Sequence, residues 1–258
     1  MSVILTSLAL GWRLAIYLTA GVLAGISNGI AGGGTFITFP TMLALGVPAL
    51  QANVSSSVGV LPSYIGGLRG YRKELTARWP LVRQLIPASL LGTGLGAALL
   101  LLGPASQFKA VVPWLIGAAT CLFASAPWLT RRLTTLDHHH PTRRRSLHAG
   151  IFLAAVYGGY FGAGLGIILL AVMSLTLSDD MGTMQGLRSA LSTLINFVAA
   201  VIFALHGHLL LEAVVMLFCG TLLGGWIGTL LIQRLRANTV RVLIVLVGLI
   251  TTVRLALA

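Results

Sequence analysis

Two long apolar segments of this chain are each interrupted by a cluster of glycines. The first covers residues 14–45 and contains Asn-Gly-Ile-Ala-Gly-Gly-Gly-Thr at 28–35, and the second covers residues 148–177 and is broken at 158–166. Glycine costs about 1 kcal/mol relative to alanine inside a helix. In hydrocarbon, broken backbone also leaves polar groups without water, so such breaks persist only where protein or a water-filled cavity covers them. A pair of broken segments in corresponding halves indicates a transporter's substrate site.

The composition places these segments in a membrane. Of the 258 residues, 57% are apolar and 9% are charged. Apolar runs long enough to span a bilayer fill most of the chain, and the alternating pattern of a membrane β-barrel is absent. We therefore expect an all-α polytopic membrane protein, in which Cys121 and Cys219 are small buried hydrophobes. The first ten residues lack the features of a signal peptide, so we expect them in the mature protein.

The formal charge of +12 is distributed in short basic clusters between apolar runs. This is the pattern of cytoplasmic loops in membrane proteins, and it argues against a nucleic-acid partner. We expect a multi-pass protein of a membrane, with lipid around it.

The order of elements is similar in the two halves of the chain. A shift of 132 positions places Gly32 on Gly164 and Gly34 on Gly166, although overall identity between the halves is weak. We expect two repeats, at 1–130 and 148–258, joined by a cytoplasmic linker at 131–147. Each repeat would contain one glycine-broken segment and three spanning helices. The expected helices lie at 49–68, 79–102, 108–129, 181–205, 209–232 and 242–257.

Loop charge distinguishes two arrangements of these repeats. If each broken segment crosses the membrane, the repeats are parallel, and the basic cluster at 234–241 lies outside. If each broken segment is a re-entrant hairpin, the repeats are inverted, and this cluster lies inside with those at 69–83 and 131–145. As one helix, residues 14–45 would be ~48 Å long, against a hydrocarbon core of ~30 Å. A steep tilt could absorb the excess, but we favour the inverted, re-entrant arrangement.

A half-helix that begins at mid-membrane directs its free N–H groups and the positive end of its dipole into the cavity. The residues that would open the two half-helices are Gly32, Gly33, Gly34, Thr35, Gly164 and Gly166. We expect them to bind an anion. The alternative is that the glycines only permit close helix packing, which is our interpretation of Gly92, Gly94 and Gly96.

Polar side chains on two further helices extend this candidate site. Asn53, Ser56 and Ser57 share a helix face at i, i+3 and i+4, although such serines often bond only to their own backbone. Arg188 is a basic residue well inside an expected span, with Gln185 and Ser189 beside it. A guanidinium is a strong partner for an oxyanion. Alternatively, Arg188 extends to the interface or pairs with Asp179 or Asp180.

Other chemistry has little support in the sequence. The run at 138–140 consists of three adjacent histidines, which cannot share one helix face as a zinc site requires. His206, His208 and Glu212 lie at a turn, where we expect an interfacial role, with a proton relay as the open alternative. No intramembrane carboxylate pair, Ser–His arrangement or phosphate-binding loop occurs. We expect no enzyme activity, no cofactor and no metal.

Several motifs together resemble those of the sulfite exporter TauE/SafE family. They are GIAGGGTFITFP at 29–40, QANVSSSVG at 51–59, GYRKEL at 70–75, FGAGLG at 161–166 and QGLRS at 185–189. The resemblance covers nearly the whole chain and implies a transporter of small sulfur-containing anions in a bacterial inner membrane. Ala171-Val172 stands where Pro40 of the first half would predict a proline, and Gln185 and Arg188 replace the family's Asn and Lys.

These observations predict a secondary transporter of small oxyanions such as sulfite, sulfoacetate or other organosulfonates. The anion would bind near the midplane, between the two broken helices. A proton and a sodium ion are the candidate coupling ions. The alternatives are an uncoupled anion channel or uniporter, a transporter of small carboxylates, and a membrane partner protein without transport activity. The sequence leaves the direction of transport and the oligomeric state open.

Overall fold

The computed structural model describes residues 2–30, 33–64, 72–134, 144–177, 179–231 and 237–256. Within these ranges the chain is helical and contains no β-strand. The helices are α1 (Ser2–Ile30), α2 (Thr35–Ala44), α3 (Ala49–Gly59), α5 (Arg72–Ala77), α6 (Trp79–Leu102), α7 (Ala105–Thr134), α8 (Arg144–Tyr160), α9 (Leu165–Thr176), α10 (Met181–His206), α11 (Leu211–Leu231) and α12 (Ala237–Ala256). The expected all-α class is therefore confirmed.

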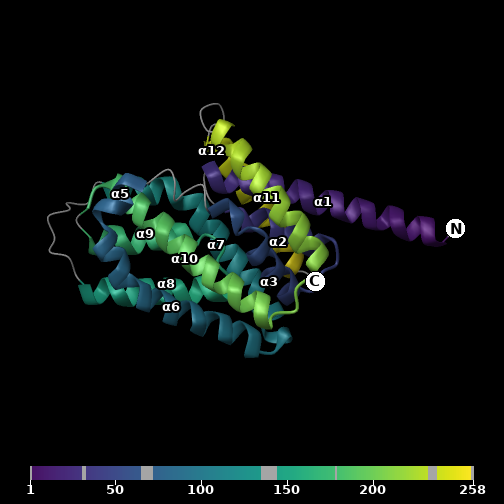
Figure 1. The fold of residues 1–258 in the computed structure, drawn as a ribbon, viewed down its shortest axis with the longest axis horizontal. Coiled ribbons are helices and arrows are strands. Elements are labelled where there is room, and N and C mark those ends of the chain that lie inside the picture. Colours follow the sequence, from purple (N-terminus) through teal and green to yellow (C-terminus); the bar gives the residue numbers. More distant parts are fainter. Residues whose placement is uncertain are drawn as a thin grey trace.

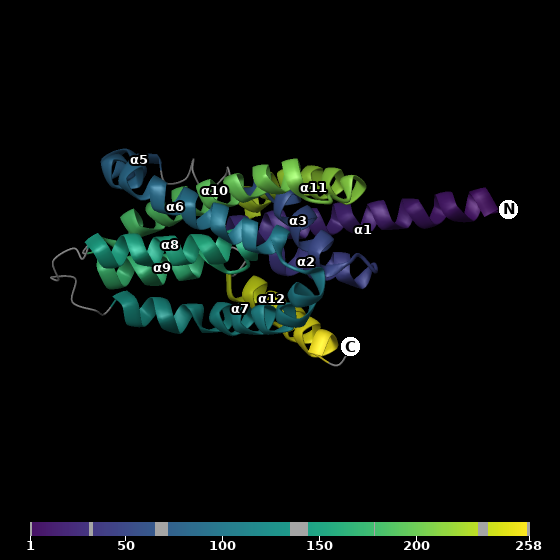
Figure 2. The same ribbon diagram turned by 90° about the horizontal axis from the view of Figure 1, so that it is seen from below.

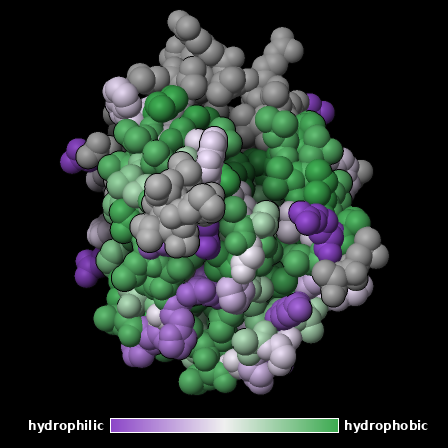
Figure 3. Space-filling view, turned by 90° about the vertical axis from the view of Figure 1, so that its right-hand side faces the viewer, coloured by the Kyte–Doolittle hydropathy of each residue, from purple (hydrophilic) through white to green (hydrophobic). Residues whose placement is uncertain are grey.

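Four of the described helices have segments long and apolar enough to cross a membrane: Trp79–Leu102, Ala105–Leu129, Gly182–His206 and Leu211–Gly228. Large apolar side chains such as Trp114 and Leu102 are exposed along them. Hydrophobic residues cover most of the coloured surface in Figure 3, and hydrophilic residues form separate patches. A surface of this kind suits lipid as the solvent. The molecule has the architecture of a multi-pass membrane protein.

Two expectations are wrong: the end of the helix at 49–68 and the burial of the two cysteines. The helix expected at 49–68 ends at Gly59, a turn follows at Val60 and Leu61, and residues 62–64 are helical again; residues 65–68 lie outside the described part. Pro62 explains this end, because proline lacks an N–H and its ring clashes with the preceding helical turn. Cys121 and Cys219 are exposed rather than buried. On a lipid-facing surface an apolar side chain needs no burial in protein.

The helices that end at the two breaks reach them from opposite ends of the molecule. In Figures 1 and 2, α1 runs inward from the end marked N, and α8 runs inward from the other end. Beyond each break, a short helix packs back against the one before it, α2 on α1 and α9 on α8. With 10 and 12 residues, α2 and α9 are only ~15 and ~18 Å long.

Glycines allow close approach in the two most extensive helix–helix interfaces, α1 with α11 and α6 with α8. On α6, a Cβ at Gly96 would lie 2.0 Å from the carbonyl oxygen of Val156 in α8. On α11, a Cβ at Gly224 would lie 2.0 Å from the carbonyl oxygen of Val22 in α1. The packing role expected for Gly92 and Gly96 is confirmed, whereas Gly94 faces open space. Close backbone approach is how membrane helices associate without a hydrophobic driving force.

Candidate anion site at the two helix breaks

The first break is held by a side chain from the end of α1. Asn28 accepts a hydrogen bond from the N–H of Gly34 through Oδ1 (2.6 Å), and its Nδ2 donates to Oγ of Ser63 (2.7 Å). Gly33 has φ of 86°, a backbone conformation that glycine adopts without strain. Gly34 is the N-cap of α2 and provides no side chain to cap it. Gly32 lies outside the described residues.

The first turn of α2 carries a buried polar group on its inner side. Thr35 is 6% exposed, and its side chain lies near the hydroxyl of Tyr64. One turn later, the hydroxyls of Thr38 and Ser56 lie 2.5 Å apart, and both residues are fully buried. The start of α2 is thus fixed to α3.

The second break has a similar construction. Gly162 and Gly164 have φ of 79° and 74°, and α9 begins directly after Gly164. The hydroxyl of Tyr157 donates to the carbonyl oxygen of Ala163 (2.6 Å). Asn53, from α3, donates through Nδ2 to the carbonyl oxygen of Tyr160 (3.0 Å), while its buried Oδ1 has no hydrogen-bond partner. A side chain of the first half therefore supports the break in the second half.

The two breaks lie close to one another. A Cβ on Gly164 would stand 4.0 Å from Cε2 of Phe36, which belongs to the first turn of α2. The ring of Phe36 packs against the ring of Phe123 of α7, with the centroids 5.5 Å apart. The Phe123 ring also covers Gly33. The N-termini of α2 and α9 therefore share one aromatic wall. The N–H groups of Phe36 and Ile37 in α2, and of Leu165 and Ile167 in α9, already donate to carbonyl oxygens of the preceding turns. What the two helix starts offer an anion is therefore mainly the positive end of each helix dipole.

Arg188 brings a positive charge to the second break. The position of a Cβ on Gly166, in the first turn of α9, is 3.5 Å from Cδ and from Nη1 of Arg188. The charge of Arg188 also acts weakly on the phenol of Tyr64, which lies near Thr35. Thr35, Tyr64, Arg188 and Gly166 thus connect the start of α2 with the start of α9. We call this group the central cluster.

The remaining expected site residues lie around the central cluster. Gln185 is half-buried and Ser189 is buried, and both lie within one turn of Arg188 on α10. Ser57 donates to the carbonyl oxygen of Asn53 (2.9 Å), so it forms the local backbone bond that was its alternative interpretation. Of the three polar residues expected on the α3 face, Asn53 and Ser56 are the two that contact the broken segments.

Sequence reasoning missed three polar residues of this region. Asn28 and Ser63 brace the first break, and Tyr64 lies near Thr35. Asn28 could have been found, because it directly precedes the glycines, and an Asn beside a broken helix end is a ready cap. Ser63 and Tyr64 had no such local signal, since they approach the site only through the turns after α3.

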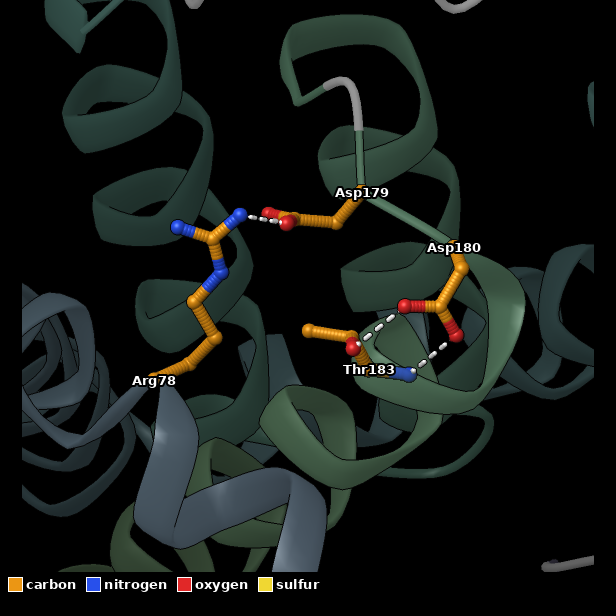
Figure 4. A network of polar contacts seen from close by, with 4 residues as sticks. All are labelled: Arg78, Asp179, Asp180 and Thr183. Atoms are coloured by element: carbon orange, nitrogen blue, oxygen red, sulfur yellow. Dashed lines mark hydrogen bonds and ion pairs between the residues drawn. The ribbon is translucent and has the colours of Figure 1, made fainter.

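A second polar group lies at the end of α9. Arg78, at the N-terminus of α6, pairs with the buried carboxylate of Asp179 (Figure 4). Asp180 caps α10 by accepting hydrogen bonds from the hydroxyl (2.6 Å) and the N–H (3.1 Å) of Thr183. These bonds hold the pKa of Asp180 below its usual value. At the opposite end of the molecule, Arg13 of α1 lies 3.9 Å from Glu212 of α11. The histidines at 138–140 lie outside the described residues.

The long apolar helices, the lipid-suited surface and the buried polar site between broken helices define a polytopic α-helical membrane protein. The chain belongs to the sulfite exporter TauE/SafE family, whose family model matches residues 17–255. It is thus a membrane transporter and not an enzyme.

Two relatives resemble the chain over nearly its whole length. A protein named "Probable membrane transporter protein" from Haemophilus influenzae is 24% identical over 249 residues, which cover 94% of each chain. "Probable membrane transporter protein ORF9" from a Sinorhizobium species is 26% identical over 251 residues, which cover 94% of this chain and 92% of the relative. No solved structure matches the chain.

Proposed function

We propose that this protein is a secondary transporter of small sulfur-containing oxyanions, such as sulfite, sulfoacetate or other organosulfonates, in the inner membrane of a bacterium. The anion binds at the central cluster, between the starts of α2 and α9. The observation that carries this proposal is the position of Arg188 beside Gly166, in the first turn of α9. A guanidinium, hydroxyls and helix N-termini are all donors, and together they favour an oxyanion.

The sulfur-containing class comes from the family to which the chain belongs. The donor set agrees with it, because sulfite and sulfonates present several oxygens to a planar guanidinium. Arg188 in place of the family's lysine keeps the positive charge but offers a bidentate fork rather than a point charge. We therefore infer a substrate with at least two oxygens on one face.

We also propose that the protein consists of two inverted repeats, each with a re-entrant hairpin, α1–α2 and α8–α9. The helix contacts support this, because they are reciprocal: α1 packs on α11 as α8 packs on α6, and α2 packs on α12 as α9 packs on α7. The lengths of α2 and α9 also support it, since neither can cross a ~30 Å core alone.

The pair of Arg78 and Asp179 gives a further argument for the inverted arrangement. Arg78 belongs to the basic loop at 69–83, which is cytoplasmic in both arrangements. In a parallel arrangement, the turn at 178–180 would lie on the outer side, a whole membrane away from that loop. Asp179 instead contacts Arg78, which puts both on one side and favours the hairpin.

The experiment that tests the function measures flux of sulfite and of sulfoacetate in proteoliposomes. We expect the wild type to transport at least one of them and Arg188→Ala to lose that transport while remaining folded in the membrane. Arg254→Ala is the matched control, because Arg254 lies in the last turn of α12, away from the central cluster. Undiminished flux in Arg188→Ala would refute the assignment of Arg188. A wild type that transports neither anion would refute the substrate class.

A further inference from the structure

A cavity of about 260 Å³ lies beside the pair of Arg78 and Asp179. It is lined by residues from α5 and α6, from the start of α8 and from the end of α9: Ala77, Arg78, Pro80, Leu81, Gln84, Arg144, Leu177 and Asp179. Water occupies about 30 Å³ in the liquid, so this space holds a small oxyanion together with several waters.

The charges around this cavity are not balanced. Two guanidinium groups, those of Arg78 and Arg144, face one carboxylate, that of Asp179. The Asp179 side chain is 8% exposed, whereas that of Arg78 is 51% exposed, so the cation is the accessible partner. Figure 4 shows one terminal nitrogen of Arg78 directed at Asp179 and the other directed away from it. An entering monoanion would balance the cavity and find an available donor.

The cavity and the central cluster lie at opposite ends of the same elements. Helix α9 starts at the central cluster, with Gly166 in its first turn, and ends beside Leu177, which lines the cavity. On α10, Arg188 lies eight positions after Asp180, which corresponds to ~12 Å along the helix axis. The cavity and the proposed binding site therefore lie at the two ends of α9.

We propose that this cavity is an anion-binding vestibule of the transport path. In the cavity, the carboxylate of Asp179 pairs with the guanidinium of Arg78. A small oxyanion that enters the cavity takes the place of this carboxylate on Arg78. The inference rests on the proposed function and adds a second binding site to it. Carboxylates and sulfonates are both oxyanions that a guanidinium binds through parallel N–H donors, so the exchange replaces like with like. Arg144 provides the second charge that holds the incoming anion.

The test uses Gln84, whose side chain lines the cavity and is exposed. In a background with Cys121 and Cys219 replaced by alanine, Gln84→Cys gives a reporter thiol. Its rate of alkylation by a maleimide is measured while methanesulfonate replaces chloride, which is not an oxyanion, at constant ionic strength. We expect methanesulfonate to slow alkylation, because the bound anion covers the thiol. Unchanged alkylation across the whole concentration range would overturn the proposal.

Asp179→Asn removes the competing carboxylate. The concentration of methanesulfonate that halves the alkylation rate should then fall by about threefold to tenfold, which corresponds to the free energy of a partly exposed ion pair. Such a gain cannot come from misfolding. Asp180→Asn is the matched control: it removes the same charge one residue away and keeps the helix cap. An equal shift in both variants would contradict the proposal, because the shift would then come from the change in net charge near the cavity and not from the loss of the Asp179 carboxylate.

Arg188→Gln separates this inference from the proposed function. We expect it to abolish flux and to leave the protection of position 84 intact; loss of protection would mean that the vestibule is not a separate site. Failure of the proposed function would show differently. Wild-type flux of sulfite and sulfoacetate would then be absent, while protection by methanesulfonate and its shift in Asp179→Asn persisted.

Discussion

Arg188 of α10 lies over Gly166 of α9, and the space that a Cβ of Gly166 would occupy is 3.5 Å from Cδ and Nη1 of the arginine. The guanidinium thus lies beside the N-terminus of a half-helix. A positive charge and the positive end of a helix dipole therefore face the same small volume. This relationship is the basis of the proposed anion site.

Replacing Arg188 with lysine tests how the charge is used. Arg188→Lys keeps the cation but removes the planar fork, so we expect folded protein with flux reduced about tenfold, the cost of one charge-assisted hydrogen bond. Initial rates of sulfite and sulfoacetate uptake by proteoliposomes provide the measurement. If the lysine variant transports both anions like the wild type, a point charge suffices and bidentate recognition is excluded.

Two glycines of the second break should respond differently to alanine. At Gly164, φ is 74°, and alanine there should destabilise the protein by about 1–2 kcal/mol. At Gly166, a Cβ makes ordinary contact with Arg188, so alanine should leave stability unchanged. It should reduce transport, because the added methyl group occupies space beside the guanidinium that the anion would use. Thermal unfolding in detergent, together with flux, distinguishes the two effects. Equal unfolding temperatures for both variants would contradict the conformational argument.

The contact between α6 and α8 depends on a missing side chain at one position and not at its neighbour. A Cβ on Gly96 would stand 2.0 Å from the carbonyl oxygen of Val156, whereas a Cβ on Gly94 meets nothing within 4 Å. Gly96→Ala should push the helices apart and lower the unfolding temperature in detergent. Gly94→Ala is the control, and we expect no loss, because alanine is the better helix former by about 1 kcal/mol. Similar behaviour of the two variants would argue against close packing at Gly96.

The inverted arrangement predicts which loops face the cytoplasm. With the native cysteines replaced by alanine, His208→Cys should react with a membrane-impermeant maleimide added outside intact cells. Arg234→Cys should react only after the membrane is permeabilised, because the inverted scheme places the cluster at 234–241 inside. Labelling of position 234 in intact cells would instead support the parallel arrangement.

Local sequence information was sufficient for the elements and for part of the site. The glycine clusters predicted where α1 and α8 end, and apolar periodicity with flanking charge predicted α6 over Trp79–Leu102. Residue type and position also predicted the half-helix starts, Asn53 and Arg188 as site residues, and their role in binding stays a prediction. These features depend on backbone strain and on the cost of charge in hydrocarbon, both of which act locally.

The features that were missed depend on contacts between distant segments. Tyr64 lies near Thr35 from a helical turn that begins at Pro62, after the break that follows α3, and Arg78 meets Asp179 across 101 positions of the chain. The exposure of Cys121 and Cys219 was missed for another reason, since hydropathy cannot distinguish a lipid-facing side chain from a buried one.

The central claim is that one anion binds between the two helix breaks, at Arg188. The most direct measurement is calorimetric titration of the purified protein with sulfite and with sulfoacetate, in the wild type, Arg188→Gln and Arg254→Gln. We predict that the wild type and Arg254→Gln bind one of the anions with the same affinity and that Arg188→Gln loses at least about tenfold. Equal affinity of Arg188→Gln and the wild type would contradict the account.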